Sequence, residues 1–554
     1  MAIIWAMGES FRRMDSLDLL YCGIGQVFKT IIYIIGVTWF LAELASALSL
    51  FLESNWDLKY KCNHLQQIYF KHPFIFVFIG LLLCLTPNLV LSYPASMCPD
   101  VWYQLLQYFG QTTFTAHHPP THTFFVGVAE NLGQFLGSGN LGLFFYIGVQ
   151  TMLFAFILSY MLNTMRKLSA PIWLRLLTFF IAIFSPYYTQ YIGLILKDNI
   201  YTYFIMLFII ELTYMLILKK DCWINKKHLF LLSISMIGSI LFRNNGKYII
   251  YPMIIIITIL LIVQNRKKCY KKIYLSALIL FIISIGVSSG IQMALVQHYQ
   301  IEEGSIREAL SLPFQQTARY AKEHGAEISL EEKEAINAIL SYDILAERYD
   351  PKISDPIKET YKEDSSIQDL VNYFKVWAQQ GMKHPLTYIE ATINQNYYLV
   401  YPLIEDTTTY NTTIIDNETN IQLARELNIH EIPIIQKIDN WRTGFNKVLF
   451  SLPILGLLSN IGFYNLILIY LCYSSTKKRI YEMVVVLMPL LLSNVVIVLA
   501  PVIMGHPRYA FPIIYSMPLV LSVFLFFSKQ DKSRFLNQGK CLISEHQMII
   551  SELK

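Results

Sequence analysis

The chain has 554 residues, of which 54% are hydrophobic and only 15% are charged. This composition excludes an ordinary soluble enzyme and is typical of a protein that crosses a membrane many times. The net charge of +5 requires no nucleic acid as a partner, because Lys and Arg clusters between apolar segments account for most of it.

Long apolar segments fill the first half of the chain and return near its C-terminus. Since a helix needs roughly 20 apolar residues to cross a hydrocarbon core of about 30 Å, we predict about eleven transmembrane helices. They cover residues 28–51, 74–93, 141–162, 171–190, 199–218, 229–243, 247–264, 273–296, 447–473, 481–503 and 511–528. Two arrangements stay open for the first of them: residues 17–51 either cross the membrane or lie in its inner leaflet.

Clusters of Lys and Arg mark alternate connections between these segments. Under the positive-inside rule such connections are cytoplasmic, so the intervening ones face outward. The clusters are Arg166-Lys167, Lys219-Lys220, Arg266-Lys267-Lys268, Lys477-Lys478-Arg479 and the tail from Lys529. Cys98 is the one cysteine that falls clearly outside, which argues against an extracellular disulfide framework.

Two outward segments are too long to be simple turns. Residues 94–140 are rich in aromatic side chains, and we expect interfacial helices there, interrupted at Pro119-Pro120. Residues 298–445 are polar and mostly helical, with capping-box spacing at Ser305/Glu308 and Ser329/Glu332. The predicted organisation is an N-terminal transmembrane module (1–297), a small extracytoplasmic helical domain (298–445), C-terminal transmembrane helices (446–528) and a cytoplasmic tail (529–554).

Asp100 follows Met97-Cys98-Pro99 just beyond the outer end of the second apolar segment, and it begins an aromatic, amphipathic stretch. A carboxylate at the membrane surface is partly desolvated, which is expected to raise its pKa and its strength as a base. The alternative is an ordinary helix N-cap, since Asp is favoured there.

Three histidines, His117, His118 and His122, surround Pro119-Pro120. Three interpretations stay open for them: contacts to a polar ligand, a divalent metal site with Asp100 and Glu130 as oxygen ligands, or hydrogen bonds within an interfacial turn.

Cations also occur where predicted helices meet the outer interface, against the usual charge bias. These sites are Lys197-Asp198, Arg243-Asn244 with Lys247, and Arg508. Positive charge near lipid is costly, so its presence indicates anionic groups nearby, and Arg is well shaped to bind phosphate. Snorkelling side chains at helix ends are the alternative. Arg307 and Arg319 either close over a substrate or lie on a solvated helix face.

The order of these residues resembles the GT-C superfamily of polytopic glycosyltransferases, which includes protein mannosyltransferases and bacterial enzymes that decorate envelope glycans. The resemblance rests on Asp100, the His-Pro-Pro motif at 118–120, Lys197-Asp198 and the long outer segment, and it covers roughly residues 74–300. It is strongest to a Gram-positive branch of the superfamily.

The resemblance implies a polyprenyl-phosphate sugar donor, an envelope glycan or protein acceptor, and an inverting displacement on the outer face of the cell membrane. Asp100 matches the family's acid in the first loop, the general base or acceptor-orienting group. The family's paired acids are absent, because Pro99 and Val101 flank Asp100; Asp198 is the candidate second carboxylate, and a metal requirement stays open. The competing classes are a flippase or transporter for a lipid-linked glycan and an envelope polymer ligase.

Overall fold

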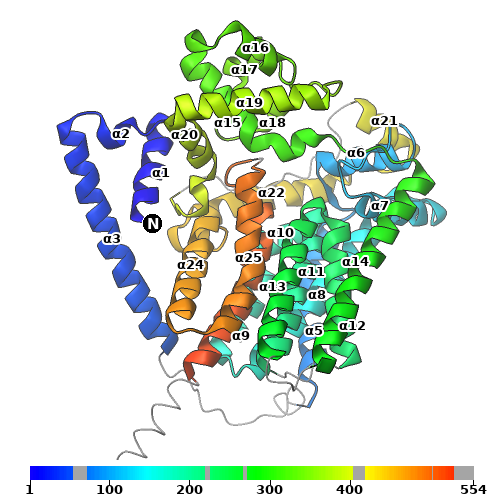
Figure 1. Cartoon of the computed structure of the whole chain (residues 1–554). Coiled ribbons are helices and arrows are strands. Elements are labelled where there is room, and N and C mark those ends of the chain that lie inside the picture. The colour runs from blue at the N-terminus through cyan, green and yellow to red at the C-terminus, as the bar shows by residue number, and fades with distance from the viewer. Residues whose placement is uncertain (54–70, 219–224, 266–270, 404–417, 502, 530–554) are drawn as a thin grey trace, which may run out of the picture.

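The computed structural model describes residues 1–53, 71–218, 225–265, 271–403, 418–501 and 503–529. These residues are almost entirely helical, and their one sheet pairs two short strands, β1 (Ser96–Met97) and β2 (Leu194–Ile195). The predicted class, an all-α polytopic membrane protein, is confirmed. Figure 1 shows long helices running down the molecule and shorter helices gathered at one end.

Among the described residues, eight helices are long and apolar enough to cross a membrane. They are α3 (Ile24–Glu53), α5 (Pro73–Leu91), α8 (Gly139–Lys167), α11 (Lys197–Thr213) with its π-helical extension η1 (Tyr214–Leu218), α13 (Lys247–Asn265), α14 (Lys271–Tyr299), α25 (Tyr481–Leu499) and a last helix over Pro507–Lys529 that begins with the 3-10 turn η7 (Pro507–Ala510).

The other expected membrane helices are shorter or broken. The helix α12 (Lys226–Phe242) is continuous but has 17 residues. Residues 171–190 form α9 (Ile172–Phe184) and α10 (Pro186–Ile192), because Pro186 has no N–H and disfavours helical geometry at Ser185.

The predicted continuous helix over 447–473 is wrong. This stretch contains the end of α22 (Pro433–Ser451), the short α23 (Pro453–Gly456) and most of α24 (Ile461–Lys477). Pro453 begins α23, and Asn460 caps α24 by accepting a hydrogen bond from the Phe463 N–H at 2.9 Å. The prediction used the average hydrophobicity of the stretch, which does not register these local breaks in the helix.

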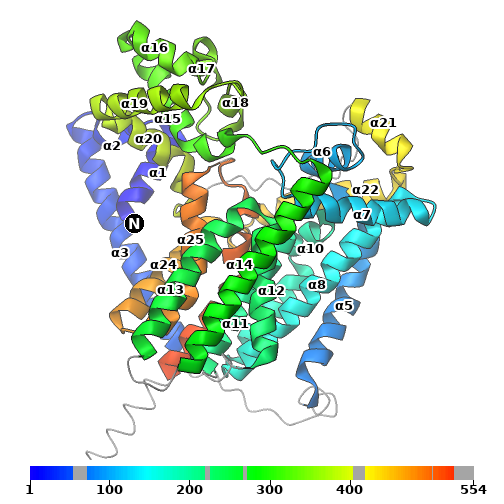
Figure 2. The same cartoon turned by 45° about the vertical axis from the view of Figure 1, so that its right-hand side comes forward.

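The bundle has two ends. We call the end that carries the helices of residues 310–399 the polar end, and the end that carries Arg166, Lys167 and Lys477 the basic end. In Figures 1 and 2, α3 runs from the polar end to the basic end along the outside of the bundle. The helix α3 therefore has the course of a crossing helix, whereas α2 (Asp18–Tyr21) lies at the polar end and α1 (Ala2–Met14) runs back down beside α3.

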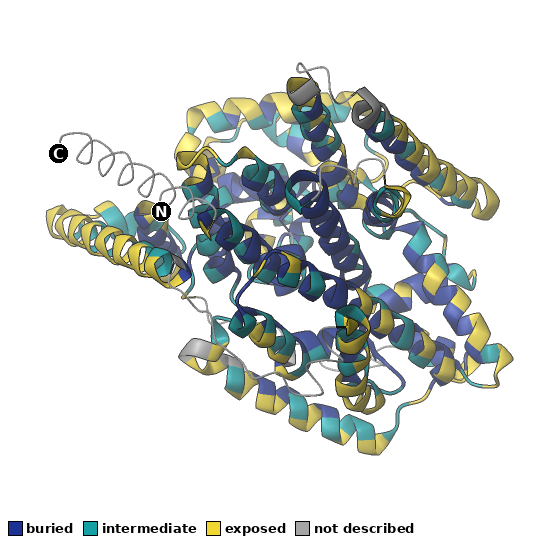
Figure 3. Ribbon diagram, turned by 90° about the horizontal axis from the view of Figure 1, so that it is seen from below, coloured by how far each residue is buried: buried dark blue, intermediate teal, exposed yellow. Residues whose placement is uncertain are grey.

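The packing is densest around α11. In the membrane-length stretch Lys197–Leu218, 89% of the residues in the most apolar part are buried inside the protein. In the most apolar part of α3 none are buried. Seen along the bundle in Figure 3, dark central helices are surrounded by helices with exposed outer faces. Those faces carry large apolar side chains such as Phe28, Ile79 and Ile282, as expected where helices contact lipid rather than water.

The segment after α14 forms a helical core of its own at the polar end, built around Phe314, Ile339 and Tyr373. Its elements are η4 (Ile306–Leu310), α15 (Ser311–His324), η5 (Gly325–Glu327), α16 (Leu330–Asn337), α17 (Tyr342–Arg348), α18 (Asp355–Lys358), α19 (Ile367–Lys383), α20 (Pro385–Asn396) and η6 (Tyr397–Leu399). The predicted capping box at Ser329 is present, whereas Ser305 caps η4 through the Arg307 N–H instead.

Arg319 ties the N-terminus to this core and does not face a substrate. Its guanidinium is 2% exposed and pairs with Glu323 at 2.8 Å and Glu390 at 2.7 Å. It also donates a hydrogen bond to the main-chain oxygen of Asp15. Both interpretations of Arg319 from the sequence are therefore wrong.

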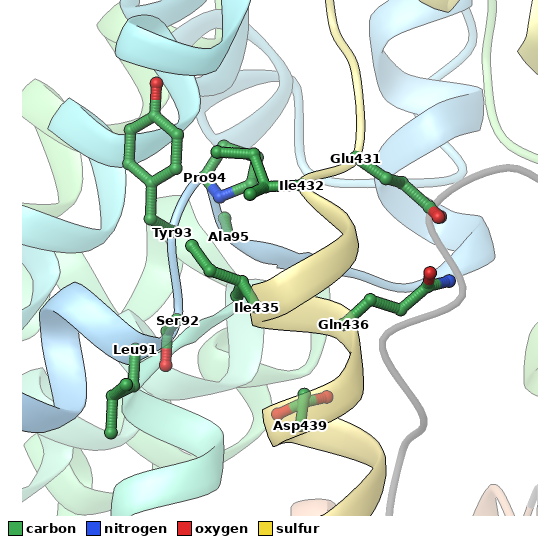
Figure 4. A pocket seen from close by; sticks show the side chains of 10 residues that line it. All are labelled: Leu91, Ser92, Tyr93, Pro94, Ala95, Glu431, Ile432, Ile435, Gln436 and Asp439. Atoms are coloured by element: carbon green, nitrogen blue, oxygen red, sulfur yellow. The ribbon is translucent and has the colours of Figure 1, made fainter.

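Residues 418–451 lie apart from that core, on the other side of the polar end in Figure 2. The helix α21 (Glu418–Glu426) lies near the interfacial helices α6 (Pro99–Tyr108) and α7 (Pro120–Phe135), as the Gln111–Glu426 hydrogen bond shows. The helix α22 packs against the chain that follows α5: Figure 4 shows Ile435 and Asp439 facing residues 91–95. Arg442 donates a hydrogen bond to Asn88 at 3.0 Å. These contacts hold the chain between α5 and β1, which leads to Asp100.

We expect the two ends to be chemically accessible from opposite sides of the membrane. Cys22 is exposed at the polar end, so a membrane-impermeant maleimide should label it in intact cells, whereas a cysteine introduced at Lys226 should react only after permeabilisation. Cys98 should stay unlabelled, because it is 1% exposed and burial raises the pKa of its thiol to about 12. Labelling of position 226 in intact cells would invert the assigned sidedness.

Candidate functional site

The short parallel pairing of β1 and β2 sets up the site. Ser96 pairs with Leu194 and Met97 with Ile195, and each strand leads directly into a helix. Parallel strands run in the same direction, so the first turns of α6 and α11 start side by side. These turns carry Asp100 and Asp198.

Cys98, and not Asp100, is the N-cap residue of α6, and no side-chain capping bond forms there. The Asp100 carboxylate instead points to two cations from other elements. Its Oδ2 lies 3.1 Å from the Lys197 Nζ and 3.7 Å from an Arg508 nitrogen. The capping interpretation of Asp100 is therefore wrong.

Lys197 also donates to the Nδ1 of His118 over 2.7 Å. Since an ammonium group has no lone pair, the His118 Nδ1 must accept, and the ring is neutral with its proton on Nε2. Burial and the neighbouring Lys197 lower the pKa of His118 well below its usual value. Lys197 therefore bridges a carboxylate and a neutral imidazole.

The electrostatics of Asp100 differ from the expectation. Burial alone would raise the pKa of Asp100, but Lys197 and Arg508 hold it well below its usual value. The predicted increase in the basicity of Asp100 is therefore wrong. That prediction considered the burial of the carboxylate but not the two cations beside it.

A second ion pair joins Arg243 to Asp198 at 2.6 Å. Arg243 lies between the rings of Tyr201 and Tyr509, at 5.2 and 5.6 Å from their centres. Its side chain is 14% exposed and that of Asp198 only 2%. Aromatic faces attract the guanidinium and fix its plane, so Arg243 is held at the end of α12 as an oriented cation.

The segment after α14 covers the site. Lys358 pairs with Glu308 at 2.8 Å and with Asp355 at 2.6 Å. The main-chain oxygen of Glu302 accepts a hydrogen bond from the Ala116 N–H at 2.8 Å, which joins this segment to the loop before His117. Asn244 donates to the Ala116 oxygen at 3.1 Å and so holds the same loop from the other side.

These groups surround a cavity of about 360 Å³ at the polar end. Its lining is Asp100, His117, His118, Pro119, Lys197, Asp198, Arg243, Asn244, Asn245, Arg307, Glu308, Asp355, Lys358, Glu359, Arg508 and Tyr509. Five lysines and arginines face five carboxylates, so the lining has no net charge while its histidines are neutral. We call this space the polar-end cavity.

Eight of the ten candidate residues from the sequence line this cavity, and two do not. Lys247 lies over the ring of Tyr248 on the exposed surface. His122 is fully buried behind the cavity, where its two ring nitrogens contact Gln104 at 3.0 Å and Tyr146 at 2.8 Å.

The metal site that was one of the three interpretations of these histidines is not formed among the described residues. Within the described ranges, the donor atoms of His117, His118 and His122 do not converge; the one group that does is His324, Glu327 and His384, in the segment after α14. Lys197 occupies the Nδ1 of His118, and hydrogen bonds occupy both nitrogens of His122. Glu130 lies elsewhere, with Gln134 and Leu427 around it.

The cavity residues that the sequence did not single out are Glu308, Asp355, Lys358, Glu359 and Tyr509. The four charged ones belong to a polar helical segment in which such residues are common. Tyr509 adjoins Arg508, and an aromatic residue next to an interfacial cation was a signal that would have suggested it.

The fold and the cavity define a polytopic membrane protein with a charged site at one end. Comparison with protein families matches residues 107–538 to a family of unknown function, DUF6020, and the chain belongs to this family. No curated protein matches the chain.

A search of solved structures finds the crystal structure of ArnT from Cupriavidus metallidurans bound to undecaprenyl phosphate. The TM-score is 0.30 and the sequence identity 10%, and the alignment covers 82% of this chain and 78% of ArnT.

We expect Lys197→Gln to destabilise the protein near neutral pH by about 1–3 kcal/mol, because Asp100 and His118 lose their shared partner. The folded pKa of Asp100 is depressed, so this carboxylate stabilises the fold above its unfolded pKa of about 4, and the effect is lost as pH falls. The difference in Tm between the variant and the native protein should therefore shrink below about pH 4. Thermal unfolding in detergent as a function of pH measures it.

Lys333→Gln is the matched control, because Lys333 pairs with Asp343 at 3.0 Å but both side chains are largely exposed. Such a pair contributes about 0–1 kcal/mol. If the two variants lose the same stability, Lys197 is an ordinary surface lysine.

Proposed function

We propose that this protein is an integral membrane glycosyltransferase. It transfers a sugar from a polyprenyl-phosphate donor to an acceptor in the cell envelope, by inverting displacement at the polar end, which faces outward. The observation that supports this is the meeting of Lys197, Arg243 and Arg508 at one cavity where membrane helices end. Three cations near lipid fit an anionic phosphate headgroup.

The reaction fits these side chains. The bond from the anomeric carbon to the phosphate oxygen breaks, and its electron pair stays on the phosphate. The three cations stabilise that developing charge, so no general acid is needed. The acceptor oxygen forms the new bond to the anomeric carbon from the opposite face and loses its proton to a carboxylate.

Asp100 is the proposed general base. Without donor, Lys197 and Arg508 keep its pKa low and its basicity weak. A bound phosphate competes for the same two cations, and its negative charge raises the pKa of Asp100 toward and above its usual value. Donor binding thereby activates the base, and Asp100 is least basic when there is no sugar to transfer.

The cover over the cavity suits the acceptor. Glu308, Asp355 and Lys358 come from the water-facing segment and lie across the cavity from α11 and α12. A hydroxyl-rich acceptor such as an envelope glycan or teichoic acid, or a protein, meets these groups while the lipid donor enters from the membrane. A metal is not required by this scheme.

The direct test is transfer by the purified protein from defined polyprenyl-phosphate sugars to isolated envelope polymers. Asp100→Asn should bind donor but lower turnover by about 10²-fold or more, since it can no longer take the acceptor proton. Near-native turnover in a folded variant would remove Asp100 from the mechanism.

Two further measurements separate the competing functions. The mass of the product distinguishes transfer of one sugar from transfer of a whole chain. A vesicle assay that detects movement of the lipid without transfer would support a transporter.

Arg243 is the proposed principal phosphate ligand, and its replacement should weaken donor binding. A charge-assisted hydrogen bond contributes about 1.5–3 kcal/mol, so Arg243→Ala should lower donor affinity by roughly ten- to hundred-fold. Arg243→Lys should recover only part, because an ammonium cannot reproduce the planar fork.

Lys247→Ala is the matched control, since this cation lies four residues further along the chain and outside the cavity. Equal donor affinity in the native protein and in all three variants would show that Arg243 is a structural anchor held by Asp198 and the two tyrosines.

A further inference from the structure

A second cavity lies at the basic end, opposite the proposed active site. It has a volume of about 460 Å³ and lies among the ends of α5, α8, α11 and α12. Its lining is Lys71, His72, Pro73, Phe74, Ile75, Phe156, Tyr160, Asn163, Arg166, Lys167, Tyr214, Lys227, His228 and Leu231. We call it the basic-end cavity.

The charges of this cavity are not balanced. Lys71, Arg166, Lys167 and Lys227 line it, and no carboxylate from the described part of the chain does. Among the described residues none of the four forms an ion pair: Arg166 donates to the Asn163 oxygen, and Lys167 lies 5.0 Å from the centre of the Tyr214 ring. The polar-end cavity, by contrast, has one carboxylate for each Lys or Arg.

A buried carboxylate organises the cavity from behind. Glu211 is fully buried in α11 and contacts the His228 Nδ1 at 2.7 Å. It also accepts a hydrogen bond from the Tyr160 hydroxyl at 2.7 Å. With Nδ1 engaged by Glu211, the Nε2 edge of His228 is the one available to a ligand.

Two further features indicate a ligand that is part lipid. The wall combines the cations with Phe74 and Phe156, whose rings pack edge to face at 5.2 Å, and Phe156 is 39% exposed toward the outside of the bundle. The cavity also lies where α11 passes into the π-helical turn η1 at Tyr214. Such turns are rare and are frequent at functional sites.

We propose that the basic-end cavity binds the phosphate headgroup of an anionic lipid in the leaflet at that end. Lys71, Arg166, Lys167 and Lys227 surround the phosphate, and His228, held by Glu211, forms part of the wall beside them. The acyl chain follows the apolar surface of Phe74 and Phe156. This site is separate from the proposed transfer reaction, and its test does not depend on that reaction.

Ordinary charge bias accounts for cations at this end of the bundle but not for their arrangement. Lys226 and Lys477 follow the bias equally well, yet neither lines this cavity. Lys226 and Lys227 are neighbours in sequence, and only Lys227 faces the cavity. A matched pair of variants can therefore separate a built site from a general surface potential.

The experiment measures binding of short-chain phosphatidylglycerol to the purified full-length protein in detergent, with phosphatidylcholine of the same chains and inorganic phosphate as the other probes. The test variant is Arg166→Gln with Lys227→Gln, and the control is Lys226→Gln with Lys477→Gln, which removes the same charge. Each lost cavity cation should weaken phosphatidylglycerol binding by about fivefold. The control should bind as the native protein does.

Several outcomes would overturn the proposal. One is an equal loss of phosphatidylglycerol binding in the two double variants, and another is equal binding of phosphatidylcholine and phosphatidylglycerol to the native protein. A third is binding of inorganic phosphate without binding of the lipid, which would assign the cavity to a soluble phosphate compound. An unchanged Tm without lipid shows that the test variant is folded. Lys71→Gln, two residues before α5, gives a second measure and should also cause about a fivefold loss.

Discussion

The polar end depends on one small interaction, the parallel pairing of two residues of β1 with two of β2. Segments almost a hundred residues apart are fixed in register by it, and each then turns into a helix. Lys197 consequently reaches both Asp100 and His118, while Asp198 reaches Arg243. A shift of one residue would turn each side chain to the other face of its strand and separate these groups.

The chain supports this pairing with buried amides. Gln150 of α8 donates to the main-chain oxygens of Ile192 and Leu194, both at 2.9 Å. Asn199, in the first turn of α11, donates to Tyr191 and Leu194. Buried backbone groups without a partner are costly, so these side chains allow irregular backbone to exist near membrane depth. The cavity is thus built beside a non-helical segment whose main-chain oxygens at Tyr191, Ile192 and Leu194 have side-chain donors.

Pairing every cation with a carboxylate has a chemical consequence. Unpaired charges beside lipid are unfavourable, and ion pairs such as Arg243–Asp198 relieve that cost before any substrate arrives. An anionic ligand must then compete with the carboxylates for the cations. In the proposed reaction the phosphate is bound less tightly than it would be by unpaired cations, but each displaced carboxylate becomes a better proton acceptor. Phosphate binding is then coupled to the base strength of Asp100.

The sequence predicted the membrane class and much of the cavity, for a physical reason. Apolar length is a strong signal, and charges at the ends of apolar segments are rare enough to be informative, as Asp100, Lys197 and Arg243 show. Where many similar residues occur together, as around Glu308 and Lys358, no single one is distinctive. The three histidines also look alike in sequence, and only packing shows that His122 is enclosed by Gln104 and Tyr146.

Breaks in the helical backbone were also predicted poorly from the sequence. Pro186 and Pro453 interrupt stretches whose average hydrophobicity is high, so a criterion based on length alone joins what the backbone separates. The pKa of Asp100 was mispredicted for a related reason, because the cations that reverse the effect of burial come from residues about a hundred and four hundred positions away.

One helix links the two ends of the molecule. Asp198 lies in the first turn of α11 and Glu211 near its last, and thirteen residues of helix separate them by roughly 20 Å. Each carboxylate is buried and engages a partner from a neighbouring helix, Arg243 at one end and His228 at the other. Between them α11 presents fully buried apolar residues, including Ile205, Phe208 and Ile209. Two polar sites separated by a packed apolar stretch suit the two proposals made above, a transfer reaction at one end of the bundle and a lipid headgroup bound at the other.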